Sequence, residues 1–79
     1  MTNIEKYANT FTEVLGVKEE QLEGLEYQAV PEWDSVGHMA LVAALEEAFD
    51  IMMDTDDIID FSSYEKGREI LSGNYGIKF

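Results

Sequence analysis

Apolar residues between Ile4 and Leu15 recur at the spacing of one face of an α-helix. They follow the i, i+3, i+4, i+7 pattern: Ile4, Tyr7, Ala8, Phe11, Val14 and Leu15. Thr2, with Glu5 three residues later, has the pattern of a capping box, and Gly16 offers an end where a positive φ is allowed. The pattern therefore predicts an amphipathic helix that buries one face against other helices.

A second helical pattern is predicted from Ser35 to Asp50. Asp34 is a good N-cap because its carboxylate can accept hydrogen bonds from amides of the next turn. One face is expected to enter the core: Leu41, Leu45 and Phe49. A neighbouring stripe is expected to be partly exposed: Val36, Met39 and Ala43. The acids near the end are expected to face solvent: Glu46, Glu47 and Asp50.

Two further helices are predicted in the last third of the chain. Residues 54–59 read as a short helix capped by Asp54 or Thr55, after which Phe61 returns to the core. Ser62 and Glu65 have the pattern of a capping box for a last helix to about residue 72, ended by Gly73. Its inward face is expected to contain Tyr64, Gly67, Ile70 and Leu71. A glycine on that face is expected to leave space in the core.

No segment reads as a strand, and residues 17–33 form a long irregular connection. Apolar side chains are available to hold this loop on the core: Leu22, Leu25, Val30 and Trp33. The sequence predicts an all-α protein, a small four-helix bundle with three main helices, a short third helix and a long loop between helices one and two. We expect one domain over residues 1–79, with 73–79 as a flexible tail.

The chain is strongly acidic, with 17 acids against 5 bases and a net charge of -12. Between Glu19 and Glu65 lie 14 of the acids and none of the bases. Nucleic-acid binding is disfavoured because phosphate backbones are held by Lys and Arg. Basic protein partners are favoured, since complementary charge speeds association, although acids also simply keep small proteins soluble.

Several kinds of segment are missing from the sequence. No apolar run approaches the ~18 residues of a membrane span, no signal peptide is recognisable at the start, and there is no cysteine. We therefore expect a cytoplasmic protein. We also expect the chain to be a monomer.

Candidate catalytic and metal-binding residues are few. His38 is the single histidine and lies three residues after Ser35, but a small hydrolase also needs an orienting group and an oxyanion hole. We therefore expect His38 to be exposed and structurally neutral, and the chain not to be an enzyme. The acids from Asp54 to Asp57 resemble a calcium loop, but Ile59 stands where that loop needs glycine, so no metal site is expected.

Ser35 lies where a long loop meets a helix. A phosphodiester attached there would be favoured by free amides and by the helix dipole, by roughly 0.3–1 kcal/mol. The same hydroxyl could also serve only in helix capping.

The second predicted helix starts within the sequence Trp33-Asp34-Ser35-Val36-Gly37 and contains, over residues 41–49, the sequence Leu-Val-Ala-Ala-Leu-Glu-Glu-Ala-Phe. Together these two stretches resemble the acyl carrier protein signature. The resemblance extends from about Ile4 to Ser72 and includes length, acidity and helix order. It implies one acyl-carrier-type domain in which Ser35 receives a 4'-phosphopantetheine arm from coenzyme A. A phosphopantetheinyl transferase would attach the arm, and acyl groups would then be carried on its thiol as thioesters.

The resemblance also implies a partner surface for acyl-loading and acyl-processing enzymes with basic docking patches. Its expected residues are Asp34, Val36, Met39, Ala43, Glu46, Glu47, Asp54 and Asp57. Tyr64 and Gly67 match positions near the acyl pocket of fatty acid carriers. Gly37 and His38 replace the acid that housekeeping carriers place there, which favours a dedicated carrier from a specialised pathway. The alternative is an unmodified acidic interaction module that docks basic partners through the second helix.

Overall fold

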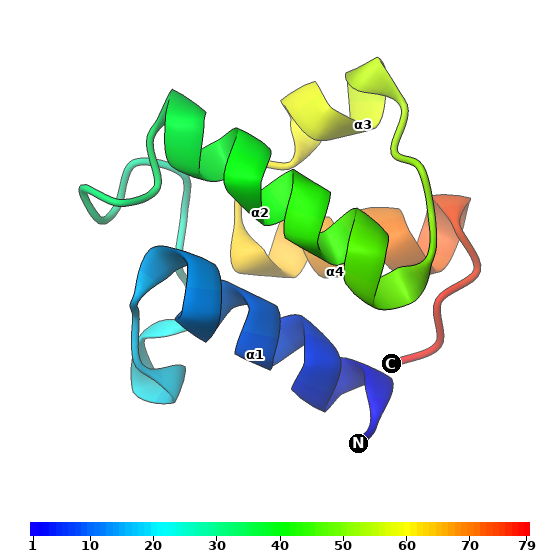
Figure 1. Ribbon diagram of the computed structural model, residues 1–79, viewed down its shortest axis with the longest axis horizontal. Helices are drawn as coiled ribbons and strands as arrows, with labels where there is room; N and C mark the ends of the chain where they lie inside the picture. Colours follow the sequence, from blue (N-terminus) through cyan, green and yellow to red (C-terminus); the bar gives the residue numbers. More distant parts are fainter.

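The computed structural model describes residues 1–79 and is all-helical (Figure 1). Its α-helices are α1 (Asn3–Leu15), α2 (Ser35–Phe49), α3 (Thr55–Asp60) and α4 (Tyr64–Asn74), with a single 3₁₀ turn at Glu19–Gln21. The predicted four-helix architecture, with a short third helix and a long first loop, is therefore confirmed. None of these helices is long and apolar enough to span a membrane.

The expected capping signals shape α1 and α2. Thr2 and Glu5 form a complete capping box, and Gly16 ends α1 with a φ of 68°. Asp34 caps α2 through its Oδ1, which accepts a hydrogen bond of 2.8 Å from the Gly37 amide. Asp50 adopts a left-handed conformation at the end of α2 (φ 54°).

Both predicted ends of the last helix are wrong. Ser63, and not Ser62, is the N-cap of α4, and its Oγ accepts from the Lys66 amide at 2.9 Å. The start lies one residue later because the long loop between α1 and α2 forms backbone hydrogen bonds with this segment. The Tyr27 amide donates to the Ser62 carbonyl, and the Tyr64 amide donates to the Leu25 carbonyl, both at 2.9 Å. At the other end, α4 continues through Gly73, whose surroundings are open and whose φ needs no left-handed conformation.

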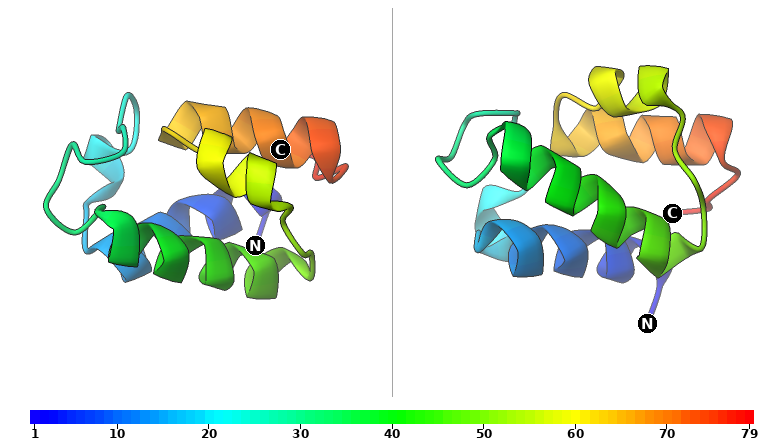
Figure 2. Two further views of the ribbon diagram at one scale, coloured as in Figure 1. Left: turned by 90° about the horizontal axis from the view of Figure 1, so that it is seen from above. Right: turned by 45° about the horizontal axis from the view of Figure 1, so that its top comes forward.

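α1 and α2 lie side by side and run in opposite directions (Figure 1). α4 packs behind them, and the short α3 lies across the edge between α2 and α4 (Figure 2). No residue of α3 is buried, so this helix covers the bundle without contributing to the centre of its core.

The core is rich in aromatic rings that come from distant parts of the chain. Phe11 of α1 contacts Trp33 of the loop and Tyr64 of α4, with ring centroids 5.4 Å and 5.0 Å apart. The completely buried side chains include Trp33, Tyr7, Phe11, Phe61, Leu41 and Leu45. Phe49, expected in the core, is only half-buried, while Val42 is buried because α2 is covered on two sides.

Gly67 does not leave space in the core, contrary to expectation. A Cβ atom built there would collide with the Phe61 ring and the Tyr7 hydroxyl. Both rings are essentially inaccessible to solvent, so they fill the room that the missing side chain provides. The absence of a side chain at Gly67 thus permits close packing of α4 on the two rings.

The last residues lie against the bundle, contrary to the expectation of a frayed tail. The Tyr75 hydroxyl donates to Asp57 Oδ2 at 2.6 Å and accepts from the Asp54 amide at 2.8 Å. Desolvation and the bond to Asp57 raise the pKa of Tyr75. Phe79 packs against Tyr7, with ring centroids 5.3 Å apart. These contacts tie the C-terminal segment to both α1 and α3.

Candidate functional site

Ser35 is the first residue of α2 and is exposed to solvent. The amides of Ser35 and Val36 belong to the first turn and have no intrahelical acceptor, while the next two amides are bound by Asp34. Free amides and the positive end of the helix dipole therefore lie next to the serine hydroxyl.

Gly37 gives the loop its path into this helix. A side chain at position 37 would overlap the carbonyl oxygen of Glu32. The missing Cβ atom lets the backbone before Asp34 pass close to the first turn of α2. The resemblance to acyl carrier proteins marks Gly37 only as a position without the usual acid, whereas the structure gives it a steric role in presenting Ser35.

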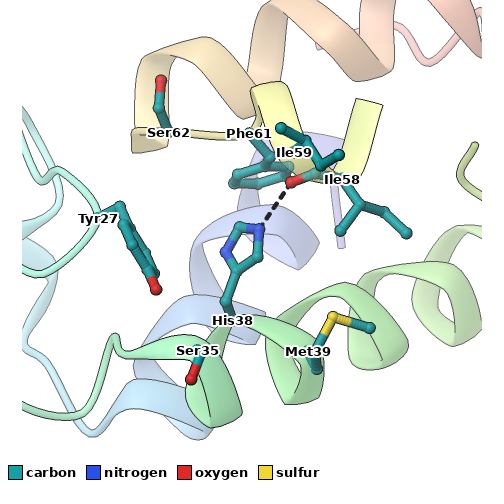
Figure 3. Close-up of a pocket in the computed structure, with 8 residues that line it drawn as sticks. All are labelled: Tyr27, Ser35, His38, Met39, Ile58, Ile59, Phe61 and Ser62. Carbon is teal, nitrogen blue, oxygen red and sulfur yellow. Dashed lines mark hydrogen bonds between the residues drawn. The ribbon is translucent and has the colours of Figure 1, made fainter. Parts of the chain in front are cut away.

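An open, mostly apolar cleft of about 350 Å³ begins beside Ser35, between α2 and α3 (Figure 3). Four parts of the chain line it: Tyr27 from the loop, Ser35, His38 and Met39 from α2, Ile58 and Ile59 from α3, and Phe61 and Ser62 from the link to α4. In Figure 3, His38 and Phe61 stand between Tyr27 on one side and Met39 and the isoleucines on the other. No Asp, Glu, Lys or Arg lines the cleft.

His38 is half-buried and hydrogen-bonded through both ring nitrogens, so the expectation of an exposed, neutral side chain is wrong. Its Nδ1 accepts from Trp33 Nε1 at 2.9 Å. Because an indole nitrogen can only donate, Nδ1 carries no hydrogen, and Nε2 therefore donates to the Ile58 carbonyl at 2.8 Å. This arrangement joins the loop, α2 and α3 through one imidazole ring.

The same geometry bears on catalysis. Both nitrogens of His38 are occupied, so the ring is not free to take a proton from Ser35. A serine hydrolase needs a base with a nitrogen available to the nucleophile. His38 therefore offers Ser35 no free ring nitrogen in this arrangement.

The residues expected on a partner surface fall into two groups. Val36 and Met39 are 77% and 54% exposed, more than the partial exposure predicted for their stripe. Solvent also reaches Asp34, Ala43, Glu47 and Asp54.

Glu46 and Asp57 form the second group. Glu46, expected to face solvent, is half-buried, and its Oε2 accepts from the Met53 amide at 2.8 Å. Asp57 is also half-buried and accepts from Tyr75 and from Asn74. These two carboxylates hold the loop after α2 and the C-terminal segment.

Sequence reasoning missed most of the cleft. Tyr64 and Gly67, expected near an acyl pocket, do not line it. Tyr27, Ile58 and Ile59 do, although each lies in a segment whose local pattern shows no pocket. The one usable signal was Trp33 five residues before His38, since a buried indole needs an acceptor.

No group of three His, Asp or Glu side chains lies close enough together to hold a metal ion. No family model, no curated protein and no solved structure matches the chain.

Proposed function

We propose that this chain is an acyl carrier protein, which carries acyl groups as thioesters on a 4'-phosphopantetheine arm attached to the Ser35 hydroxyl. The observation that carries the proposal is the position of Ser35. Its side chain is exposed at the first turn of α2 and lies at the mouth of an uncharged cleft. An attachment point beside a cleft is what a carrier needs in order to shelter a tethered group.

The chain's own groups fit a phosphodiester at this place. The first-turn amides point toward the helix start, and their dipoles favour a negative group there by about 0.3–1 kcal/mol. In the transfer, Ser35 Oγ bonds to the phosphorus of the arm, and the bond from that phosphate to the rest of coenzyme A breaks. The hydroxyl proton passes to a base of the transferase, since His38 has no free nitrogen. The chain is thus a substrate of its loading enzyme.

The negative charge of the chain favours partner enzymes with basic docking surfaces. The exposed side chains of Val36 and Met39 lie on α2 with Glu47 further along the helix, and the whole chain has a net charge of -12. Apolar contact surrounded by acids suits a docking patch rich in Lys and Arg. Gly37 and His38 stand where housekeeping carriers have an acid, and this departure favours a carrier dedicated to a specialised pathway.

An unmodified acidic interaction module remains the second candidate. The exposure of Val36 and Met39 favours it, because large apolar side chains on a helix surface can dock a partner without any modification. Such a module would bind its partner equally well with alanine at position 35.

Incubation with coenzyme A and a broad-specificity phosphopantetheinyl transferase, followed by intact mass measurement, tests the proposal. We expect one phosphopantetheine adduct on the natural chain, one on Ser62→Ala and none on Ser35→Ala. Ser62 is a matched control because it is exposed and lines the same cleft. The absence of an adduct on the natural chain, or its presence on Ser35→Ala, would rule out the carrier function.

A further inference from the structure

We infer that the cleft beside Ser35 selects a compact, uncharged acyl group that contains an aromatic ring, over a long linear acyl chain. The inference rests on the proposed attachment at Ser35 and concerns which cargo the chain shelters. Three properties of the cleft carry it: its closed floor, its aromatic lining and its lack of charge.

The cleft is small and does not continue into the bundle. Its volume of about 350 Å³ is near the lower end of the roughly 300–1,000 Å³ typical of ligand pockets. None of its lining residues lines any other cavity of the molecule. A long chain would therefore extend from the cleft into water after its first few carbons are buried.

Tightly packed rings form the floor. His38 is held at both nitrogens, and its ring lies 5.8 Å from Phe61, centroid to centroid. Phe61 is 1% exposed and fills the space next to Gly67, so neither ring can move aside without disturbing the core. The route deeper between α2 and α4 is closed for this reason.

The lining offers rings and soft apolar groups to a ring-bearing ligand. Tyr27 lines one side of the cleft, Met39 and Ile59 flank the other, and the His38 ring stands between them (Figure 3). The centroids of Tyr27 and His38 are 5.4 Å apart. Edge-to-face ring pairs and sulfur–ring contacts stabilise an aromatic group beyond the gain from buried area alone. A linear chain with the same number of carbons gains stability only from the burial of its apolar area.

Charge excludes carboxylated cargo. The cleft contains no cationic side chain, and the protein around it has a net charge of -12. A carboxylate entering the cleft would lose hydration without gaining a partner, and the surrounding acids would repel it.

Loading matched cargo onto the chain tests the inference. A broad-specificity transferase can attach phenylacetyl, octanoyl and hexadecanoyl forms of the arm from the corresponding coenzyme A thioesters. Phenylacetyl and octanoyl groups contain the same number of carbons. For each form, the rate of thioester cleavage by hydroxylamine is divided by the rate for the same thioester on free pantetheine, which removes intrinsic reactivity.

We expect the phenylacetyl form to be cleaved about two- to tenfold more slowly than the octanoyl form after this correction. The octanoyl and hexadecanoyl forms should be cleaved at equal rates. Protection that increases steadily up to hexadecanoyl, or equal protection of phenylacetyl and octanoyl, would overturn the inference.

The methionine methyl groups report where the cargo lies. Met39 lines the cleft, whereas Met52 is 86% exposed and lies outside it. With ¹³C-methyl methionine, the phenylacetyl form should shift the Met39 resonance and leave that of Met52 unchanged. Tyr27→Leu keeps apolar volume but removes one ring, so it should reduce the advantage of phenylacetyl over octanoyl.

A second arm separates failure of this inference from failure of the proposed function. Free phenylacetyl and octanoyl thioesters of N-acetylcysteamine are titrated into the unmodified chain while the Met39 methyl resonance is followed. Tighter binding of the phenylacetyl probe supports the cleft's preference even if Ser35 accepts no arm. Equal or weaker binding of that probe contradicts the preference even if Ser35 is loaded efficiently.

Discussion

Replacing Gly67 with alanine tests directly whether the core under the cleft is closed. The added Cβ atom would meet the Phe61 ring and the Tyr7 hydroxyl, both buried. One of them must move, and Tyr7 moves only by weakening the bond of 2.6 Å from its hydroxyl to the Tyr64 carbonyl. The substitution therefore combines overpacking with the loss of a buried hydrogen bond.

The expected magnitude follows from three opposing effects. Alanine in a helix is favoured over glycine by about 0.5–1 kcal/mol. Overpacking a well-filled core costs about 1–3 kcal/mol, and the weakened Tyr7 bond costs about 0.5–1.5 kcal/mol. We therefore expect Gly67→Ala to lower the free energy of unfolding by about 0.5–4 kcal/mol. The Tm should fall by about 4–8 °C for each kcal/mol.

Gly73→Ala is the matched control on the same helix. No atom lies within contact of a Cβ built at Gly73, and its φ is not in the left-handed region. This variant should be as stable as the natural chain or more stable, by up to about 1 kcal/mol. Thermal unfolding followed by far-ultraviolet circular dichroism measures both. If Gly67→Ala equals or exceeds the natural chain in stability, the core has room at that point and the floor of the cleft is not closed.

Three other measurements test the hydrogen bonds and charges of the site and the core. His38→Ala leaves the buried Trp33 indole without its hydrogen-bond acceptor. The free energy of unfolding, measured in urea by Trp33 fluorescence, should therefore fall by about 1–3 kcal/mol. A loss under about 0.5 kcal/mol would mean that His38 behaves as an ordinary surface residue. Burial raises the pKa of Tyr7 above its ordinary value of 10.0, so the unfolded chain releases this proton first and stability should fall as the pH rises above about 10. Tyr7→Phe should lose less stability over the same alkaline range, and identical pH profiles would contradict this role. Loading by the transferase should slow with added salt and with Glu47→Gln but not with Glu13→Gln, an exposed acid on α1; equal effects of the two variants would argue against docking on α2.

The helices and the position of Ser35 could be predicted because the relevant interactions are local. Capping joins residues three apart, as in Thr2 with Glu5 or Asp34 with Gly37, and the apolar period repeats within a single helix. Such signals fail when a distant segment intervenes. The N-cap of α4 is Ser63, where the local pattern predicts Ser62, because the long loop between α1 and α2 forms hydrogen bonds with the backbone there.

The cleft could not be predicted, because its walls come from four segments and no single one shows the pattern of a pocket. His38 illustrates the difference. Its sequence neighbours suggested an exposed side chain, yet its ring is tied to Trp33 and to the Ile58 carbonyl twenty residues later. The packing around Gly67 could not be predicted either, because the atoms that crowd it belong to rings from α1 and from the α3–α4 link.

The sequence by itself determined an acidic all-α chain with a serine at the start of its second helix, since charge, period and capping are written in residues close together. Only the tertiary structure decided what surrounds that serine. Packing of α2 against the loop, α3 and the α3–α4 link places an uncharged, aromatic-floored cleft beside Ser35 and occupies both nitrogens of His38. The physical reason is that cavities and buried hydrogen bonds arise between elements, and side chains far apart in the sequence set their size and chemistry.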